Sequence, residues 1–493
     1  MGSLEETLDP KDWEQSRKLA HEMVDDAIEH LETVRERSVW QEMPNHVRAY
    51  YDTPAPMAPQ KLEAVYEELQ KNLLPYSMGN IHPRFWGWYM GSSNFTGALG
   101  DFLAAVDGSN LGGGNTAAAL MDSQVVDWFK ELMGFPTSAS GTLTSGRSMA
   151  NLVALTVARN AMAGIDVRAE GIMAMPQPLR FYASDQVHTC HQKALETLGL
   201  GAKSLSEIAS DNHQRMNISK LEQAIVEDIA AGIKPACVIA TAGTTNTGAL
   251  DDLKAIAQIC KRHAMWFHVD GCIGALLRIA PKHKSLVDGM ELADSIALDP
   301  HKWLHTPFEA GCVLLRDAKR HFETFEMHGD YLQLQTRGVI AGRFLADYGF
   351  ELSRGFKALK IWMSLKENGV EKFGRLIDQN IELAQYLEQL VLSKPKLQIV
   401  APVGLNIVCF RYANQITDEA RLKEINTEIM LRIQESGLAV PSDTTVAGKH
   451  CLRVAINNHR TTRQDLDVFI EGVINCGDEL EALAAKGPSR TDT

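Results

Sequence analysis

The chain has 493 residues, of which 45% are hydrophobic and 23% are charged, and its formal net charge is −13. This composition is typical of a globular protein, and the length predicts either several lobes or one large α/β domain with appendages. An acidic chain lacks the basic face on which binding to nucleic acid or to an anionic membrane depends. We therefore expect no nucleic acid and no membrane among its partners.

The cysteines and the N-terminus bear on location in the cell. The 8 cysteines include no Cys-x-x-Cys pair, so we interpret them as reduced thiols. The N-terminal stretch MGSLEETLDPKDWEQSRK is acidic and polar, unlike a secretory signal, and no apolar run reaches the length of a membrane span. We expect a cytoplasmic protein.

Residues 1–81 are predicted to form an N-terminal helical segment. An apolar residue recurs at every fourth position from Leu19 to Leu31, which indicates a helix with one apolar stripe over about 10–36. A second helix is predicted over 60–75, after the proline-rich link YYDTPAPMAP. Two such helices cannot bury their apolar faces by themselves, so we hypothesise that they pack at a dimer interface.

Residues 82–365 are predicted to form a large domain. Helical patterns alternate with short apolar runs, which indicates a mostly parallel sheet covered on both faces. The predicted strands are 181–185, 237–243, 265–271, 295–300 and 311–317, and the helices between them include 148–164, 221–232 and 253–263. A helix at about 355–368 leads to a smaller C-terminal α/β domain, residues 366–493. Ligands of such sheets bind at the carboxyl ends of the strands, so the polar residues there are the candidates for a site.

The segment TLTSGRSMANLVAL, 142–155, is a candidate phosphate site. Its Ser-Gly-Arg-Ser turn opens a predicted helix, so backbone amides near Gly146 and the Ser148 hydroxyl can together bind a phosphate. Arg147 either adds a cation or points to solvent. Considered alone, the segment is at least as well explained by an ordinary serine N-cap.

Three further polar residues follow predicted strands. His188 could stack on a planar ligand, whereas we expect the nearby His191 at the surface. Asp270 ends the run FHVDG and could pair with a cationic nitrogen. Lys302 in DPHKW could attack an aldehyde if it were desolvated. Considered singly, each is better explained as a surface or turn residue.

Together these residues meet the needs of one cofactor, pyridoxal 5'-phosphate. The turn at 146–148 accepts the phosphate, and His188 covers the ring. Asp270 keeps the ring nitrogen protonated, so that the ring can take up electrons, and Lys302 holds the aldehyde. The complete set, rather than any one member, predicts a pyridoxal-phosphate site in which Lys302 and His188 are catalytic.

Four stretches of the chain carry a family resemblance: SDQVHTCHQKA, VIATAGTTNTGALDDL, FHVDGCIGA and DPHKWLHTP. They resemble the group II pyridoxal-phosphate-dependent amino-acid decarboxylases, which include aromatic-L-amino-acid decarboxylase, and the likeness runs from about residue 82 into the C-terminal unit. The resemblance implies the type I, aspartate-aminotransferase-like fold and an obligate homodimer with active sites at the interface. It also implies that Thr245 and Asp299 lie near the cofactor and that His301, beside Lys302, is catalytic.

Two departures from the family bear on mechanism. The family often has glycine or another small residue where Arg147 stands. Aromatic decarboxylases also carry a mobile-loop tyrosine that is thought to donate a proton, and an ungapped count places Leu345 there, beside Phe344. Tyr331 and Tyr348 flank this position, but neither aligns without a gap. In the aldehyde synthases of the family, phenylalanine replaces the tyrosine, and the product is an aldehyde with ammonia and peroxide.

The stretch HPRFWGWYMG, 82–91, is rich in aromatic residues. By the resemblance Trp88, Tyr89 and Met90 face the substrate, although such a stretch is as readily explained as core. We therefore predict decarboxylation of an aromatic L-amino acid to the amine and carbon dioxide. The alternatives are an aromatic aldehyde synthase, a decarboxylase of a small acid such as 2,4-diaminobutyrate, and a cofactor-binding dimer without activity.

Overall fold

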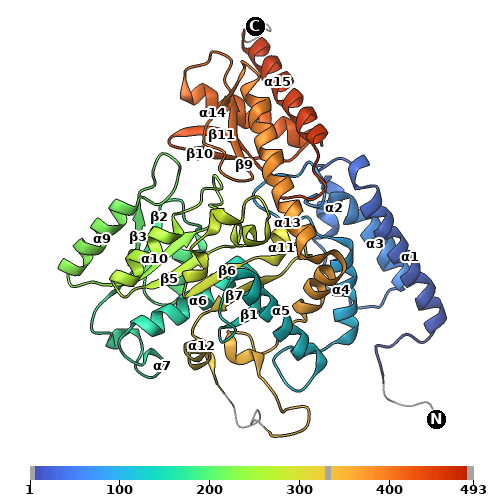
Figure 1. The fold of residues 1–493 in the computed structure, drawn as a ribbon. Coiled ribbons are helices and arrows are strands. Elements are labelled where there is room, and N and C mark those ends of the chain that lie inside the picture. The colour runs from blue at the N-terminus through green and yellow to red at the C-terminus, as the bar shows by residue number, and fades with distance from the viewer. Residues whose placement is uncertain (1–5, 328–334, 486–493) are drawn as a thin grey trace, which may run out of the picture.

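A seven-stranded sheet forms the centre of the large domain (Figure 1). The computed structural model describes residues 6–327 and 335–485. The strands lie in the order β1-β7-β6-β5-β4-β2-β3, and every neighbouring pair is parallel except those that involve β7. Their bounds are β1 Ser140–Thr144, β2 Leu179–Ser184, β3 Leu205–Ile208, β4 Lys234–Thr241, β5 Trp266–Asp270, β6 Ser295–Leu298 and β7 Gly311–Leu315. The predicted α/β class with a mostly parallel sheet is confirmed.

Two of these strands, β1 and β3, were absent from the sequence prediction. The sequence of β1 is Ser-Gly-Thr-Leu-Thr, which is too polar to stand out as an apolar run, although all of its residues are buried. Strand β3 is short, lies at the edge of the sheet and is only partly buried, so its pattern is weak. Both are recognised through pairing with a neighbouring strand, which a local pattern does not contain.

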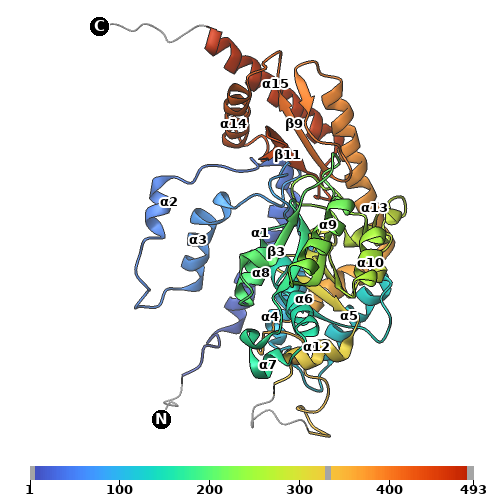
Figure 2. The same cartoon turned by 90° about the vertical axis from the view of Figure 1, so that its left-hand side faces the viewer.

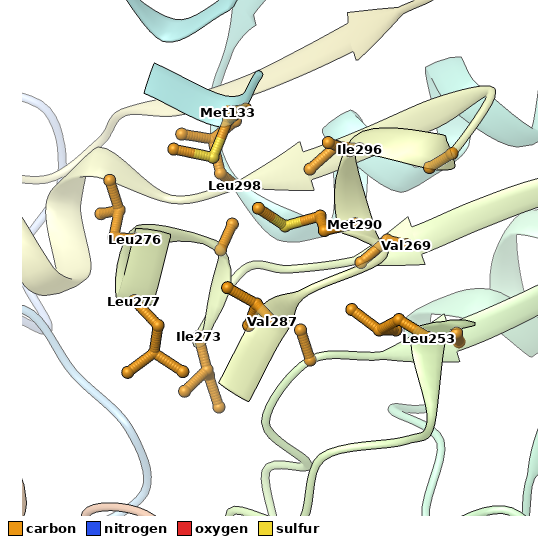
Figure 3. Packing of buried hydrophobic residues seen from close by; sticks show 14 of the residues in the cluster. Met133, Leu253, Val269, Ile273, Leu276, Leu277, Val287, Met290, Ile296 and Leu298 are labelled. Carbon is orange, nitrogen blue, oxygen red and sulfur yellow. The ribbon is translucent and has the colours of Figure 1, made fainter. Parts of the chain in front are cut away.

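Helices cover both faces of the sheet, because successive strand residues point to opposite sides. The helices of the large domain are α4 Phe95–Asp107, α5 Ala117–Met133, α6 Arg147–Met162, α7 Val167–Glu170, α8 Cys190–Thr197, α9 Ile218–Ala230, α10 Leu253–Arg262, α11 Pro300–Trp303 and α12 Ala318–Phe325. On one face Val238 and Ala240 of β4 join a core with α5, α9 and α10, part of which appears around Met290 in Figure 3. On the other face Cys237 and Ile239 pack against α6 and α8.

The C-terminal unit is built on a four-stranded antiparallel sheet in the order β10-β11-β9-β8. Its elements are β8 Leu397–Ile399, β9 Ile407–Tyr412, α14 Glu419–Glu435, β10 Ser442–Val446, β11 Lys449–Ala455 and α15 Arg463–Ala485. Helix α13, Lys357–Leu392, runs from the large domain into this unit (Figure 1), and its helical dihedral angles are interrupted at Gly369, where φ is 70°. The predicted domain boundary after residue 365 therefore falls inside α13, shortly before this interruption.

The N-terminal segment leaves apolar surface uncovered. Its helices are α1 Trp13–Glu32, α2 Asn45–Tyr50 and α3 Leu62–Asn72. They lie along one side of the molecule in Figure 1, and α2 and α3 project from its body in Figure 2. Leu19 of α1 is buried, but Trp13 and Leu62 are exposed, as are Phe102 and Val106 of α4. Among the residues that the structure describes, no helix is long and apolar enough to cross a bilayer.

Candidate active site

The carboxyl ends of β1, β2, β4, β5 and β6 converge on a cavity of about 520 Å³. This is the position expected for a ligand site on a parallel sheet. Seven of the predicted cofactor residues line the cavity: Gly146, Arg147, Ser148, His188, Thr245, Asp299 and Lys302. His301 lines it as well. Asp270 lies behind this lining, in contact with Arg147. The fold thus brings together residues that are separated by more than 150 positions in the chain.

Lys302 is a buried amine at the end of β6. Asp299 and Pro300 end the strand and begin the short helix α11, which carries Lys302 in its first turn. The Lys302 side chain is 7% exposed, and its Nζ lies 2.8 Å from Asp299 Oδ2. Nζ also lies 5.7 Å from the centre of the Tyr89 ring, at the wall of the cavity. Lys302 is therefore positioned as a nucleophile and not as a surface charge.

Asp270, the last residue of β5, is a fully buried carboxylate. Arg147 Nε lies 3.2 Å from its Oδ2 and 3.3 Å from its Oδ1. His191 Nε2 lies 2.8 Å from Oδ2, and the Cys272 amide donates to Oδ1 at 3.2 Å. Burial by itself raises the pKa of Asp270, but the charge of Arg147 and the hydrogen bond from His191 outweigh it and hold the pKa well below its ordinary value. The carboxylate is thus kept ionised for a cationic partner.

His191 is the functional residue that the sequence interpretation assigned wrongly. We expected it at the surface, yet it is fully buried on α8 with its ring directed at Asp270. Helix α8 begins shortly after β2 and packs against α6, and this turns His191 inward. The helix pattern is the signal that could have found it, because His191 lies three and four positions before the apolar residues Ala194 and Leu195, which are buried on the same face of α8.

Two further histidines line the cavity as neutral imidazoles. Burial, reinforced by the nearby charge of Arg147, lowers the pKa of His188 to about 4. Burial also lowers the pKa of His301, even though Asp299 acts to raise it. His301 Nδ1 lies 2.6 Å from the Ala310 carbonyl oxygen, and its Nε2 lies 3.7 Å from Asp299 Oδ2. At neutral pH both rings therefore present a nitrogen lone pair or an N–H without a full charge.

The predicted phosphate turn forms the N-terminus of α6. Gly146 has φ of 138°, and a Cβ there would lie 3.1 Å from His301 Cε1, so a larger residue would strain the turn. No side chain among the described residues caps this terminus. Its backbone N–H groups, next to the exposed Ser148, are therefore free to bind an anion.

Two of the three residues predicted to face the substrate reach the cavity. Trp88 and Tyr89 line it, and Trp88 is 56% exposed. The structure does not bring Met90 to the lining, because its side chain packs against the small cluster of Val39, Phe85 and Val440. Met90 contributes its carbonyl oxygen instead, which accepts a hydrogen bond from Asn457. The prediction for Met90 is thus not supported by its position.

The described residues of the loop thought to govern the last proton transfer do not line the cavity of their own chain. Leu345 is buried in a cluster with Leu111, Ala118 and Ala119, and the neighbouring Phe344 is partly buried. The ring of Tyr348 lies 5.1 Å from the His321 ring. Tyr331 lies outside the described residues. None of these three described loop residues lines the cavity.

The side chains around the cavity fit pyridoxal phosphate with one exception. The buried Lys302 amine supplies a partner for the aldehyde, and the ionised Asp270 supplies one for the ring nitrogen. The free backbone N–H groups at the N-terminus of α6, which we call the anion cup, supply a partner for the phosphate. The exception is Arg147, whose guanidinium lies against the carboxylate that a ring nitrogen would need. The fold and the site define a pyridoxal-phosphate-dependent enzyme of the type I fold.

Comparison with known proteins identifies the family. The model described as the pyridoxal-dependent decarboxylase conserved domain matches residues 44–413, and the chain belongs to this family. The chain is 34% identical to an aromatic-L-amino-acid decarboxylase of Bacillus atrophaeus over 92% of this chain and 93% of that protein. It is 29% identical to a phenylacetaldehyde synthase of Arabidopsis thaliana, over 91% and 93% of the two chains. The solved structure of Oryza sativa TDC with PLP and tryptamine matches with a TM-score of 0.88 at 26% identity, over 96% of this chain and 100% of that chain.

Proposed function

We propose that the protein decarboxylates an aromatic L-amino acid to the corresponding amine and carbon dioxide. The observation that carries this proposal is the aromatic wall beside the reactive lysine, formed by Trp88 and Tyr89. Aromatic walls favour an aromatic side chain through buried area and ring contacts. The similarity to the aromatic-L-amino-acid decarboxylase of Bacillus atrophaeus supports the same substrate class.

The residues of the cavity have distinct roles in this reaction. Pyridoxal phosphate, when bound, supplies an electron-withdrawing ring that stabilises charge at the α-carbon. Lys302 would provide the amine that holds the cofactor aldehyde, and Asp299 Oδ2, 2.8 Å from Nζ, orients this amine. Asp270 provides the negative charge for the ring nitrogen. His188, neutral and only partly buried, lines the cavity and would cover the ring of the bound cofactor.

The proposal includes a cytoplasmic homodimer. Exposed apolar residues on α1, α3 and α4 give this chain a surface that a second copy would cover, among them Trp13, Leu62, Phe102 and Val106. Such an accumulation of exposed apolar residues is unusual for a monomer. All eight cysteines carry free thiols, and Cys476 alone is not fully buried, which supports a reducing compartment.

A product assay tests the reaction. The purified protein, supplied with pyridoxal phosphate, is incubated separately with L-tryptophan, L-tyrosine, L-phenylalanine, L-glutamate and L-2,4-diaminobutyrate. We expect amine and carbon dioxide in equal amounts from at least one aromatic amino acid and neither product from the other two acids. Lys302→Ala removes the amine and serves as the inactive control, because it should abolish product and the absorbance band of the cofactor condensed with the lysine.

The same assay separates the alternatives. Peroxide and ammonia in amounts equal to carbon dioxide would identify the protein as an aldehyde synthase and not a decarboxylase. This outcome is measured because a relative from Arabidopsis thaliana is an aldehyde synthase and because Phe344 and Leu345 stand where decarboxylases carry the loop tyrosine. Turnover of L-2,4-diaminobutyrate alone would contradict the aromatic substrate. Cofactor binding without any product would indicate a dimer that has lost activity.

A further inference from the structure

Arg147 occupies an unexpected place in the cavity. It is the first residue of α6, so its backbone belongs to the anion cup, but its side chain extends away from the cup to Asp270. The side chain is 8% exposed, and its Nε lies at nearly equal distances, 3.2 and 3.3 Å, from the two carboxylate oxygens. A single N–H thus faces both oxygens, as the N–H of a protonated ring nitrogen would.

The carboxylate has little capacity left for a second cation. Oδ2 accepts from His191 and Oδ1 accepts from the Cys272 amide, at 2.8 and 3.2 Å. The remaining approach, between the two oxygens, is taken by Arg147 Nε. A ring nitrogen that is to pair with Asp270 must therefore take the place of the guanidinium.

The guanidinium is incompletely bound where it lies. Its Nη1 donates to Thr245 Oγ1 at 2.5 Å, but Nη2 is buried without a hydrogen-bond partner among the described residues. A buried donor of a charged group that lacks a partner costs free energy. Arg147 also lines the cavity and belongs to a helix terminus, where a change of rotamer requires no change in the sheet. These are properties of a side chain that can be displaced.

We propose that Arg147 is a placeholder for the cofactor: its guanidinium neutralises Asp270 in the cofactor-free protein and competes with the cofactor ring for the same carboxylate. A buried carboxylate without a cation is strongly destabilising, so the placeholder stabilises the cofactor-free fold. The consequence is a lower affinity for the cofactor, because only molecules in which Arg147 has moved away can bind it. This inference depends on the family's cofactor and not on the amino acid that the enzyme decarboxylates.

Cofactor titration of the purified apo protein tests the proposal. We would measure the Kd for pyridoxal phosphate by absorbance, and for pyridoxamine 5'-phosphate by protein fluorescence, because the amine form does not condense with Lys302. If molecules with Arg147 displaced make up about a tenth of the cofactor-free population, Arg147→Gly should lower both Kd values about tenfold. The same substitution should lower the thermal midpoint of the apo protein, while the midpoint at saturating cofactor changes much less.

Two further variants keep the test decisive. Arg147→Met retains length without charge, so it should also lower both Kd values if charge at Asp270 is what excludes the cofactor. Arg147→Lys retains a cation and should bind more weakly than Arg147→Met, and it serves as the folded reference if Arg147→Gly does not fold. Unchanged or higher Kd values in both Arg147→Gly and Arg147→Met would overturn the proposal. Unchanged values would mean that Arg147 has no effect on cofactor binding, and higher values would mean that it binds the phosphate. Wild-type protein that binds neither cofactor form would instead overturn the proposed function.

Discussion

At the scale of single residues, the environment of each side chain decides its chemistry. Lys302 presents a buried amine and Asp270 a buried carboxylate, and burial of such groups is costly unless partners are supplied. Asp299 lies against Lys302, and Arg147 and His191 lie against Asp270. The site is therefore a set of paired polar groups in which the loss of one partner leaves another group without compensation.

His191 allows this dependence to be measured. His191→Ala leaves the Asp270 carboxylate with one fewer donor, and we expect the thermal midpoint of the apo protein to fall by about 1–3 °C. The Kd for pyridoxal phosphate should rise as well, because Asp270 is held less firmly. His191→Gln, whose amide can replace the Nε2 donor, should recover much of both losses. Equal effects of the alanine and glutamine variants would show that His191 acts only by filling space.

At the scale of elements, strand β11 of the small domain holds two loops of the cavity. Arg453 of β11 is 4% exposed, and it donates to the carbonyl oxygens of Trp88 at 2.5 Å and Asn246 at 3.0 Å, and also to that of Thr245. One planar guanidinium thus ties the aromatic wall and the loop after β4 to the C-terminal sheet. The small domain positions the site without lining it.

The hydrogen bonds of Arg453 predict a specific kinetic effect. Arg453→Met should release the backbone at Trp88 and raise KM for the aromatic substrate about tenfold, equivalent to ~1.4 kcal/mol. Arg411 is the matched control, because it is equally buried on the neighbouring strand β9 but pairs with Glu419 at 2.7 Å. Arg411→Met should lower stability and leave KM unchanged. A comparable rise of KM in both variants would assign the effect to general loosening of the domain.

At the scale of the whole molecule, the uncovered helices on one side of the chain predict the assembly. Phe102 and Val106 of α4 are 58% and 70% exposed, and α1 and α3 leave further apolar residues uncovered. We expect sedimentation velocity to give twice the chain mass of 54.4 kDa. Phe102→Glu should shift the protein towards the monomer, since it places a charge in a buried apolar interface.

The control for assembly is an exposed apolar residue elsewhere. Leu392 at the end of α13 is 62% exposed in the small domain, so Leu392→Glu should leave the sedimentation coefficient unchanged. A wild-type protein that sediments as a monomer at micromolar concentration would contradict the proposed dimer. A shift caused equally by both substitutions would place the interface elsewhere.

The sequence by itself determined the α/β class and the cofactor, and it predicted most of the residues that meet at the cavity. The reason is local: Gly146, Asp270 and Lys302 each stand at the end of a pattern that predicts a strand or a helix start. In a parallel sheet the strand ends that carry Asp270 and Lys302 must lie at one edge, so the convergence of these two residues follows from the pattern alone. Strands β1 and β3 were not predicted, because β1 is polar, β3 is short and only partly buried, and the identity of both depends on pairing.

Only the tertiary structure decided how the charges of the site are shared. Whether Arg147 faced solvent, whether His191 was buried and whether Met90 reached the cavity depend on which elements pack against each residue. Sequence spacing locates a residue on its own helix or strand, but it does not state which side chain from another element lies opposite. Burial and charge pairing are properties of that second element, and for this reason the competition between Arg147 and the cofactor emerged only from the folded chain.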